Sequence, residues 1–493
     1  MIAAGFLYIL IGLPLLCGGL CLACRSAQSV MVTIRAGIAG TATSAGFCIW
    51  AVSQEGSITA LYSWLRLDAL SAYHLAVMMV VVTLVAFYLP GYFREEIRDD
   101  RFSVNSARRF GVLWSGAVAA MCSVLISNNI GLMWVGIEAT TLVTAFLICI
   151  HRTRESIEAM WKYLIICSVG IAFAFMGTLL AGAAANEIHL PPSQSLLWTT
   201  LRDNASGLDP VLLKIAFVFI MVGYGTKAGL APMHSWLPDA HSQAPAPVSA
   251  LFSGFMLNAA LYCIMRYVPL VEGSSGHAGW SLKLLLFFGL TSMLVAAAFI
   301  VFQRDLKRLL AYHSVEHLGI IAVGLGLGGL GTFAALLHTL NHSVCKSLAF
   351  FAAGRLGQMY GSHDMHEMAG ALRAAPVWGK GLFGSLLVLI GVAPFAIFLS
   401  ELLILRAAAK SGSYWTVGLF LAGAGIVFVG ALQHAINIAW GEPATAPKRE
   451  RAGGMDKIIV AVSLGALLIL GLWIPGTISR MINDASGILG GIQ

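Results

Sequence analysis

The sequence has few charged residues: Asp, Glu, Lys and Arg make up 11% of its 493 residues, against about 25% in ordinary soluble domains. Hydrophobic residues make up 58%. This composition excludes a string of soluble domains and predicts an integral membrane protein. The net charge of +7 does not indicate nucleic-acid binding, because the basic residues lie at alternate ends of apolar segments rather than in one patch.

Motifs for redox chemistry and nucleotide binding are also absent. The nine cysteines are scattered, and the closest set, Cys17, Cys21 and Cys24, has no histidine nearby, so packing explains it and no metal or cluster site is indicated. Residues 324–329 satisfy GxGxxG but do not follow a strand. The first 24 residues lack a basic start and are too long for a signal-peptide core, which predicts a retained helix. We expect no cofactor in this chain.

Long apolar runs, in contrast, fill the chain. Cutting at charged and proline-rich breaks gives about 14 candidate spans, each near the ~20 residues that cross a hydrocarbon core. The expected fold class is therefore an all-α polytopic membrane protein. The spans begin near Ile2, Ser29, Leu67, Arg109, Ile130, Lys162, Val211, Val248, Leu282, Ala311, Thr332, Val377, Tyr414 and Lys457.

The basic residues predict how the chain is oriented. Eighteen of them, including Lys448 and Arg449, follow odd-numbered spans, whereas at most eight, including Arg266, lie on the opposite face. Basic loops favour the cytoplasmic side. We therefore expect both termini outside, in the inner (cytoplasmic) membrane of a bacterium or archaeon.

The stretch Gly223 to Gly254 places a lysine, prolines, an aspartate and two histidines in an otherwise apolar region. Its Lys227 lies inside a hydrophobic helix that Pro232 interrupts. An ammonium near the bilayer centre costs roughly 2.5–3.5 kcal/mol, so it needs a partner or a water-filled cavity, which proton handling also uses. The alternative is a helix-end lysine that extends to the membrane interface.

Glu138 lies in the middle of another apolar span, with no cation within a turn of it. A buried carboxylate must stay protonated or find a positive charge on another helix, and Lys227 is the candidate. The alternative is a neutral acid bonded to Thr140, Thr141 or a backbone carbonyl. In a later span, Asn258 is either polar glue between helices or a holder of a relay water.

Two later spans carry titratable residues at helical spacing. His313 and His317 are four residues apart, with Glu316 beside them. His338, His342 and Lys346 then recur at every fourth residue, which predicts a row about 12 Å long at ~1.5 Å per residue. The histidine pairs could bind zinc, but a lysine in the same row would repel a dication. A proton path explains the row better, because imidazole exchanges protons near neutral pH.

A second interruption, Gly391 to Pro394, repeats the Gly-X-Ala-Pro pattern of Gly229 to Pro232 and precedes Glu401. Paired broken helices indicate a transport site built on an inverted repeat. We therefore expect spans seven and twelve to be discontinuous, in two half-channels, one around Glu138 and Lys227 and the other around Lys346 and Glu401. The expected segments are residues 1–108, three N-terminal helices; 109–280 and 281–440, the two half-channel repeats; and 441–493, a C-terminal helix.

The chain resembles the antiporter-like proton-translocating subunits of complex I and its relatives across nearly its whole length. The residues that carry the resemblance are WVGIEATTL, TKAGLAPMHSWLPDAHSQAPAPVSALFSG, DLKRLLAYHSVEHLG, HTLNHSVCKSLAFFAAG, DMHEMAGALRAAP and FLSEL. Within this group, NNIGLMWVGIEATTL and Asn258 look most like component F of hydrogenase-4 and formate hydrogenlyase-type complexes.

The resemblance implies a role for each matching residue. Glu138 and Lys227 would form a charge pair that opens and closes, and Glu401 would be the outlet group. Asn258 departs from the pattern, because many relatives have lysine there. His338, His342 and Lys346 would carry the proton along the central axis. From their position in the chain, we also expect the histidines of both spans, His313 and His317 included, to bridge the two half-channels.

The resemblance also implies partners. The chain would be a subunit of a nickel–iron hydrogenase or NADH:quinone oxidoreductase complex, with other membrane and peripheral subunits and no nucleic acid. Iron–sulfur clusters and a nickel–iron centre or flavin would lie in those partner subunits. Two alternatives are a cation/proton antiporter subunit with no redox partner and a membrane anchor whose channel is vestigial.

Overall fold

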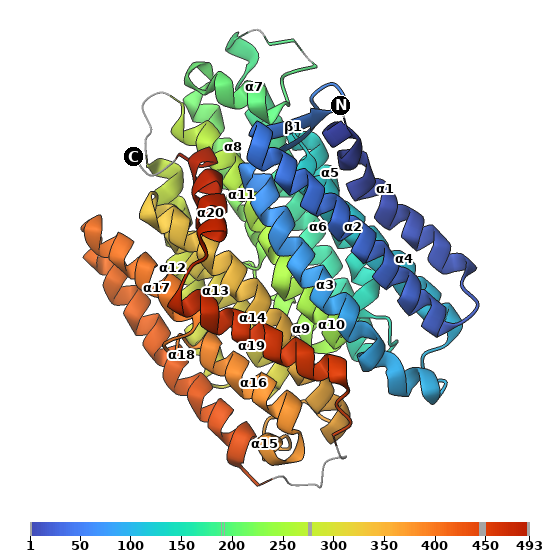
Figure 1. Ribbon diagram of the computed structural model, residues 1–493. Coiled ribbons are helices and arrows are strands. Elements are labelled where there is room, and N and C mark those ends of the chain that lie inside the picture. Colours follow the sequence, from blue (N-terminus) through green and yellow to red (C-terminus); the bar gives the residue numbers. More distant parts are fainter. Residues whose placement is uncertain (1, 189, 192, 275–278, 443–449, 491–493) are drawn as a thin grey trace.

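The computed structural model describes residues 2–188, 190–191, 193–274, 279–442 and 450–490; Lys448 and Arg449, counted above for the orientation, lie outside these residues. The described chain is a bundle of long, roughly antiparallel helices with one small hairpin (Figure 1). The first half of the bundle contains α1 (Ile2–Ala23), α2 (Ala27–Glu55), β1 (Ser57–Ala60), β2 (Leu65–Asp68), α3 (Ala69–Arg98), α4 (Val104–Ile126), α5 (Ile130–Ile148), α6 (Arg154–Ala183), α7 (Trp198–Asp203) and α8 (Pro210–Ala228).

The second half begins after the first break in a membrane helix. It contains α9 (Trp236–Gln243), α10 (Ala246–Leu251), the π-helical turn η3 (Phe252–Met256), α11 (Leu257–Glu272), α12 (Trp280–Ile300), α13 (Leu306–Leu327), α14 (Leu330–Tyr360), α15 (Ala371–Ala374), α16 (Pro376–Leu389), α17 (Ala396–Lys410), α18 (Tyr414–Trp440), α19 (Gly454–Leu472) and α20 (Gly476–Ile488). Two single 3₁₀ turns, η1 (Asn186–Ile188) and η2 (Ala205–Gly207), flank α7.

Twelve helices of the described residues are long and apolar enough to cross a membrane, which makes the chain a multi-pass membrane protein. The helix α14 is not among them, in keeping with the polar row that it carries. The helices α16 and α17 are also excluded, because the break between them leaves each shorter than a span. Thirteen of the fourteen starts expected from the sequence lie within five residues of the start of one of the twelve spans or of α14 or α16. The start expected near Lys162 lies eight residues after the N-terminus of α6 at Arg154.

Some short elements at the ends of the bundle were not expected from the sequence. The hairpin β1–β2 and the short helix α7 cap the same end of the bundle, opposite α15 (Figure 1). The segment 441–493, expected to hold one helix, holds both α19 and the amphipathic α20. The hairpin is only four residues per strand, too short for an alternating pattern to distinguish it from a polar loop.

The two Gly-X-Ala-Pro segments both break a helix, as expected. The helix α8 ends at Ala228 before Gly229, and α16 ends at Leu389 before Gly391; both glycines have positive φ, 77° and 71°. The peptide bonds that precede Pro232 and Pro394 are both cis. Hydrogen bonds hold the first break in place: Ala231 N–H donates to Ser292 on α12 (2.9 Å), and the Trp236 indole donates to the Thr226 carbonyl (2.9 Å).

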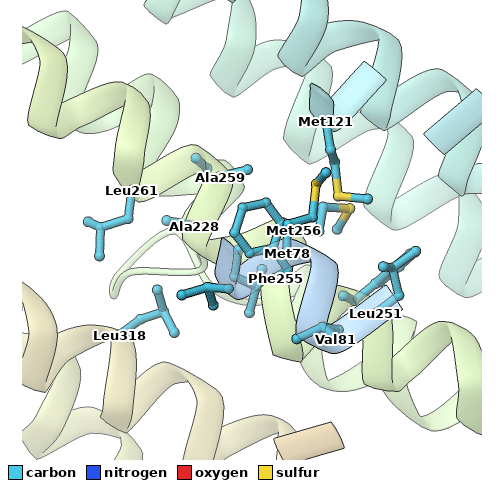
Figure 2. Close-up of a cluster of buried hydrophobic side chains, with 14 of the residues drawn as sticks. Met78, Val81, Met121, Ala228, Leu251, Phe255, Met256, Ala259, Leu261 and Leu318 are labelled. Atoms are coloured by element: carbon cyan, nitrogen blue, oxygen red, sulfur yellow. The ribbon is translucent and has the colours of Figure 1, made fainter. Parts of the chain in front are cut away.

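The centre of the bundle is packed around η3 and α14. Figure 2 shows Phe255 and Met256 of η3 among Met78 and Val81 of α3 and Met121 of α4. The helix α14 contacts α3, α10, α13, α16, α17 and α19, so both of its faces are covered. A polar residue on α14 is therefore enclosed by protein rather than by lipid, which fits the way membrane proteins hold intramembrane polar groups.

Candidate functional site

Lys227 lies in the last turn of α8 and is 0% exposed. Its ammonium donates to the Thr141 hydroxyl on α5 (3.0 Å) and to the Tyr163 hydroxyl on α6, and it lies 4.6 Å from the centre of the Tyr163 ring. Tyr163 in turn contacts the hydroxyl of Thr144 (2.6 Å). The complete burial excludes a lysine that extends to a membrane interface, because its charged end is enclosed by three helices.

Glu138 lies on α5, one turn before Thr141, and its side chain is partly exposed. One carboxylate oxygen accepts a hydrogen bond from Ser168 on α6 (3.0 Å), and the other has no partner among the described residues. The structure therefore does not contain the direct Glu138–Lys227 pair that we expected. The Thr141 and Tyr163 hydroxyls occupy the donors of Lys227 instead.

The histidines of α13 and α14 form one connected cluster that joins the two helices. His313 Nδ1 is 2.9 Å from Glu316, and His317 Nδ1 is 2.9 Å from His338 Nε2. The rings of His317 and His342 lie 5.3 Å apart, and both nitrogens of His342 lack a partner among the described residues. All five side chains are buried, so the expected row faces the protein interior.

Lys346 continues the row on α14 and donates to the Leu310 carbonyl on α13. It is 0% exposed. Near the other end of the row, Asn341 donates to the Ala396 carbonyl (2.8 Å), which ties α14 to the first residue of α17 after the second break. The row is thus anchored at the helix interruption.

Glu401 lies on α17 beside this row and is partly exposed. One of its carboxylate oxygens lies within 4.8 Å of ligand nitrogens of His317 and His338. The preceding residue, Ser400, contacts His338 Nδ1 (2.9 Å). Ser400 has no distinctive sequence spacing, and only its position next to Glu401 could have suggested it.

Two sets of side chains have the spacing of metal ligands: the carboxylate and ring nitrogens of His313, Glu316 and His317, and those of His317, His338 and Glu401. Both sets are already linked internally by hydrogen bonds. Lys346 lies one turn beyond His342, and its positive charge opposes a dication nearby. The same contacts suit the exchange of protons, because each imidazole can accept a proton at one nitrogen and release one at the other.

His241 on α9 lies between the surroundings of Lys227 and the row that ends at Lys346, and the sequence alone gave it no role. Its ring stacks on Phe350 (4.9 Å between centroids), over which Lys346 lies at 5.1 Å. On the other side its ring lies 6.0 Å from Phe252, which contacts the Tyr163 ring at 6.0 Å. Both ring nitrogens of the buried His241 lack a partner among the described residues. It is a titratable group placed between Lys227 and Lys346.

Asn258 bridges helices, as polar glue does. Its amide nitrogen donates to Ser343 on α14 (3.1 Å) and to the Gly254 carbonyl in η3 (3.2 Å). Its side-chain carbonyl oxygen is buried and accepts no hydrogen bond from the described residues.

A buried ion pair that was not expected lies between β2 and α11. Arg266 donates to both oxygens of Asp68 (2.6 and 2.7 Å), and Arg266 also donates to Tyr262 (2.9 Å). Burial by itself would raise the pKa of Asp68, but Arg266 and the Ser71 N–H outweigh it and hold the pKa at about 2. We counted Arg266 only as one of the basic residues on the face opposite the cytoplasmic one; the structure shows that it is buried and paired with Asp68, 198 residues away in sequence.

Known proteins share this sequence pattern. A family model described as "NADH:quinone oxidoreductase/Mrp antiporter, TM" matches residues 127–427. The chain is 39% identical over 386 residues to a hydrogenase-4 component F homolog from Methylacidiphilum infernorum, covering 77% of this chain and 80% of that protein.

Solved structures share the fold over almost the whole chain. One is the membrane-bound sulfane sulfur reductase, described as an archaeal respiratory membrane complex, with a TM-score of 0.86 and 23% identity over 99% of this chain and 98% of that one. Another is the Mrp complex from Dietzia sp. DQ12-45-1b, with a TM-score of 0.87 and 19% identity over the same shares. Both matches are subunits of multisubunit membrane complexes. The matched residues 127–427 include all the titratable residues of the two groups. The chain belongs to the family of antiporter-like proton-translocating membrane subunits of the complex I, hydrogenase and Mrp type.

Proposed function

We propose that this chain is the proton-translocating membrane subunit of a complex I-like oxidoreductase, of the hydrogenase-4 or formate hydrogenlyase type or of the NADH:quinone oxidoreductase type. The observation that carries the proposal is a set of buried titratable side chains, from Lys227 past His241 to Lys346 and His338, inside a multi-pass helical bundle. The similarity to the hydrogenase-4 component F homolog favours the hydrogenase type. In this proposal, redox chemistry in a separate arm drives protons outward through this chain.

The first half-channel centres on Lys227. In the present arrangement its ammonium is held by Thr141 and Tyr163. Because Glu138 is one turn from Thr141 on α5, a shift of the order of ~5 Å along that helix would bring the lysine to the carboxylate. Two unit charges ~4 Å apart gain about 4 kcal/mol at an effective dielectric constant of 20, more than the ~2.3 kcal/mol that moving a charge against 100 mV requires. The change in electrostatic energy when this contact opens is therefore large enough to drive a proton off the lysine.

The second half-channel centres on Lys346 and Glu401. His313, His317, His338 and His342 pass protons by way of Glu316 and Ser400. Glu401, which is partly exposed, is the outlet group.

The proposed architecture has 14 spans, counting α14 and the α16–α17 pair, in inverted-repeat halves at 109–280 and 281–440. The matching breaks at Gly229 and Gly391 support this division. The basic loops support an inner-membrane location in a bacterium or archaeon with both termini outside. Partner subunits supply the iron–sulfur clusters and a nickel–iron centre or flavin.

A cation/proton antiporter subunit without a redox partner is the second candidate. The likeness to the Mrp complex favours it, because that fold covers 99% of this chain. The same buried lysines and histidines would serve sodium or potassium exchange.

One experiment distinguishes the two candidates. The chain is kept with its native partners in inside-out membrane vesicles, in which outward transport acidifies the lumen. The lumen pH is followed after adding an electron donor or, separately, a sodium or potassium pulse. The proposal predicts acidification with the electron donor alone, together with nickel or iron in the co-purified subunits. Proton movement driven only by the cation pulse, with no metal in the partners, would favour the antiporter.

A further inference from the structure

A cleft between α2 and α3 lies outside both half-channels. It has a volume of about 600 Å³, within the range of ligand-binding pockets. Three arginines line it, Arg35, Arg94 and Arg98, together with the apolar side chains of Met31, Val32 and Ile97. No acidic residue is among the described residues that line it.

Arg35 has no counter-ion among the described residues. It is the only charged side chain of α2 before Glu55, and it lies nine residues after the N-cap Ser26, or about 13 Å along the helix axis. It is exposed at the surface of the bundle and makes no hydrogen bond or ion pair to any described residue. A charge on the lipid-facing side of a membrane helix is costly unless an anion meets it.

The α3 side of the cleft adds two more positive charges. Arg94 and Arg98 are one turn apart in the last two turns of α3, so they share a face. Arg94 also has no partner among the described residues, whereas Arg98 donates to the exposed Asp99 (3.2 Å). The side chains of α3 and α2 therefore present at least two uncompensated positive charges to one cleft.

We infer that this cleft binds an anionic phospholipid. The phosphate is bound by Arg35 and Arg94, with Arg98 at the rim. The acyl chains lie on Met31, Val32 and Ile97, because these apolar side chains line the same cleft as the arginines. Basic pockets between membrane helices on the cytoplasmic side bind headgroups of this kind, and the basic loops of this chain indicate that side. A neutral or cationic lipid lacks the charge that the three arginines require.

The test uses the full chain purified in detergent with its native partner subunits. Bound phospholipids are identified and counted for wild type, for the double variant R35Q/R94Q and for the matched control R154Q/R373Q, which removes two exposed arginines outside the cleft. Wild type and the control are expected to retain about one phosphatidylglycerol or cardiolipin per chain more than the R35Q/R94Q variant. Equal retention by all three proteins would overturn the inference.

Add-back of lipid to delipidated protein distinguishes the source of the phosphate. Thermal stability is measured against phosphatidylglycerol, phosphatidylcholine and inorganic phosphate. Phosphatidylglycerol should stabilise wild type, with an apparent affinity about fivefold weaker for each arginine removed and roughly 25-fold weaker in R35Q/R94Q. The inference fails if phosphatidylcholine stabilises equally, or if inorganic phosphate alone gives the full shift.

A photo-crosslinker at Val32, whose side chain is 55% exposed in the cleft, identifies the occupant in the assembled complex. The expected product is a crosslink to lipid. A crosslink to an acidic segment of a partner subunit would show that a protein contact, not a phospholipid, neutralises Arg35, and would overturn the inference. Neither outcome depends on proton translocation, so the inference and the proposed function fail separately.

Discussion

Two hydroxyl groups stand where a counter-ion of Lys227 would be expected. Thr141 and Tyr163 each accept a hydrogen bond from its ammonium, and neither carries a charge at neutral pH. A buried ammonium held only by neutral acceptors is less stabilised than one paired with a carboxylate. For this single residue, the arrangement makes the protonation of Lys227 sensitive to any movement of Glu138.

Replacing Tyr163 by phenylalanine tests the importance of that hydroxyl. The variant removes one of the two acceptors of Lys227 and should slow proton translocation by about tenfold, corresponding to the loss of a hydrogen bond to a charged group worth roughly 1.5 kcal/mol. Tyr267→Phe is the matched control, because it removes a buried hydroxyl that contacts Thr178 (2.9 Å) and no lysine. If both variants pump equally fast at equal expression, Tyr163 only contributes to stability.

The buried pair of Arg266 and Asp68 makes a separate prediction about stability. Arg266→Gln leaves Asp68 as an uncompensated buried charge and should destabilise the chain by about 3–5 kcal/mol. Arg101→Gln, at an exposed pair with Asp99, should leave the melting temperature close to that of wild type, because water and salt screen this pair. Thermal unfolding in detergent measures both, and a small effect of Arg266→Gln would show that the pair is not an essential contact.

The same pair predicts a pH dependence. Burial raises the pKa of Asp68, but Arg266 outweighs this effect and holds the pKa in the folded chain at about 2, below its ordinary value of 3.8. A carboxyl group whose pKa is lower in the folded chain than in the unfolded chain stabilises the folded state at any pH above its unfolded-state pKa. This stabilisation is lost as the pH falls from the unfolded-state pKa through the folded-state pKa. Wild type should therefore lose this contribution only between about pH 4 and pH 2. A variant with Asp68→Asn should show no such step in an acid titration of its melting temperature.

At both helix breaks, a glycine lies in close contact with a side chain from the segment that follows the break, and at the second break this side chain is Glu401. Gly391 has φ 71°, and a Cβ placed on it would meet a carboxylate oxygen of Glu401 at 2.5 Å. Gly229 has φ 77°, and its Cβ would meet Leu237. The breaks therefore do more than end a helix, because each glycine also leaves room for a side chain from the segment after the break.

Two alanine substitutions distinguish the cost of a strained backbone from the cost of a steric clash between the new methyl group and Glu401. Gly412 has a similar φ of 72°, and no atom lies within 4 Å of the place that a methyl group would take, so Gly412→Ala should cost only the strain of about 1–2 kcal/mol. Gly391→Ala should cost more and also lower proton translocation, because Glu401 must move. Thermal unfolding and vesicle acidification measure the two effects, and equal behaviour of the two variants would contradict a role for the contact with Glu401.

Over the whole molecule, sequence predicted what depends on local spacing. The row from His338 to Lys346 and the pair His313 and His317 follow from helical periodicity, and the helix ends before Pro232 and Pro394 follow from proline chemistry. Contacts between distant segments could not be read in this way. The Arg266–Asp68 pair joins residues 198 apart, and Tyr163 and Ser400 enter the site only through the packing of α6 and α17.

The proposed proton route through the buried side chains of this chain is tested by lumen acidification per electron transferred. The measurement uses sealed vesicles that contain the complete complex with Lys227→Ala. Lys283→Ala is the matched control, because Lys283 is an exposed lysine on the membrane helix α12. We expect Lys227→Ala to retain assembly and lose proton translocation, whereas Lys283→Ala pumps like wild type. Wild-type acidification by Lys227→Ala would contradict the proposed route.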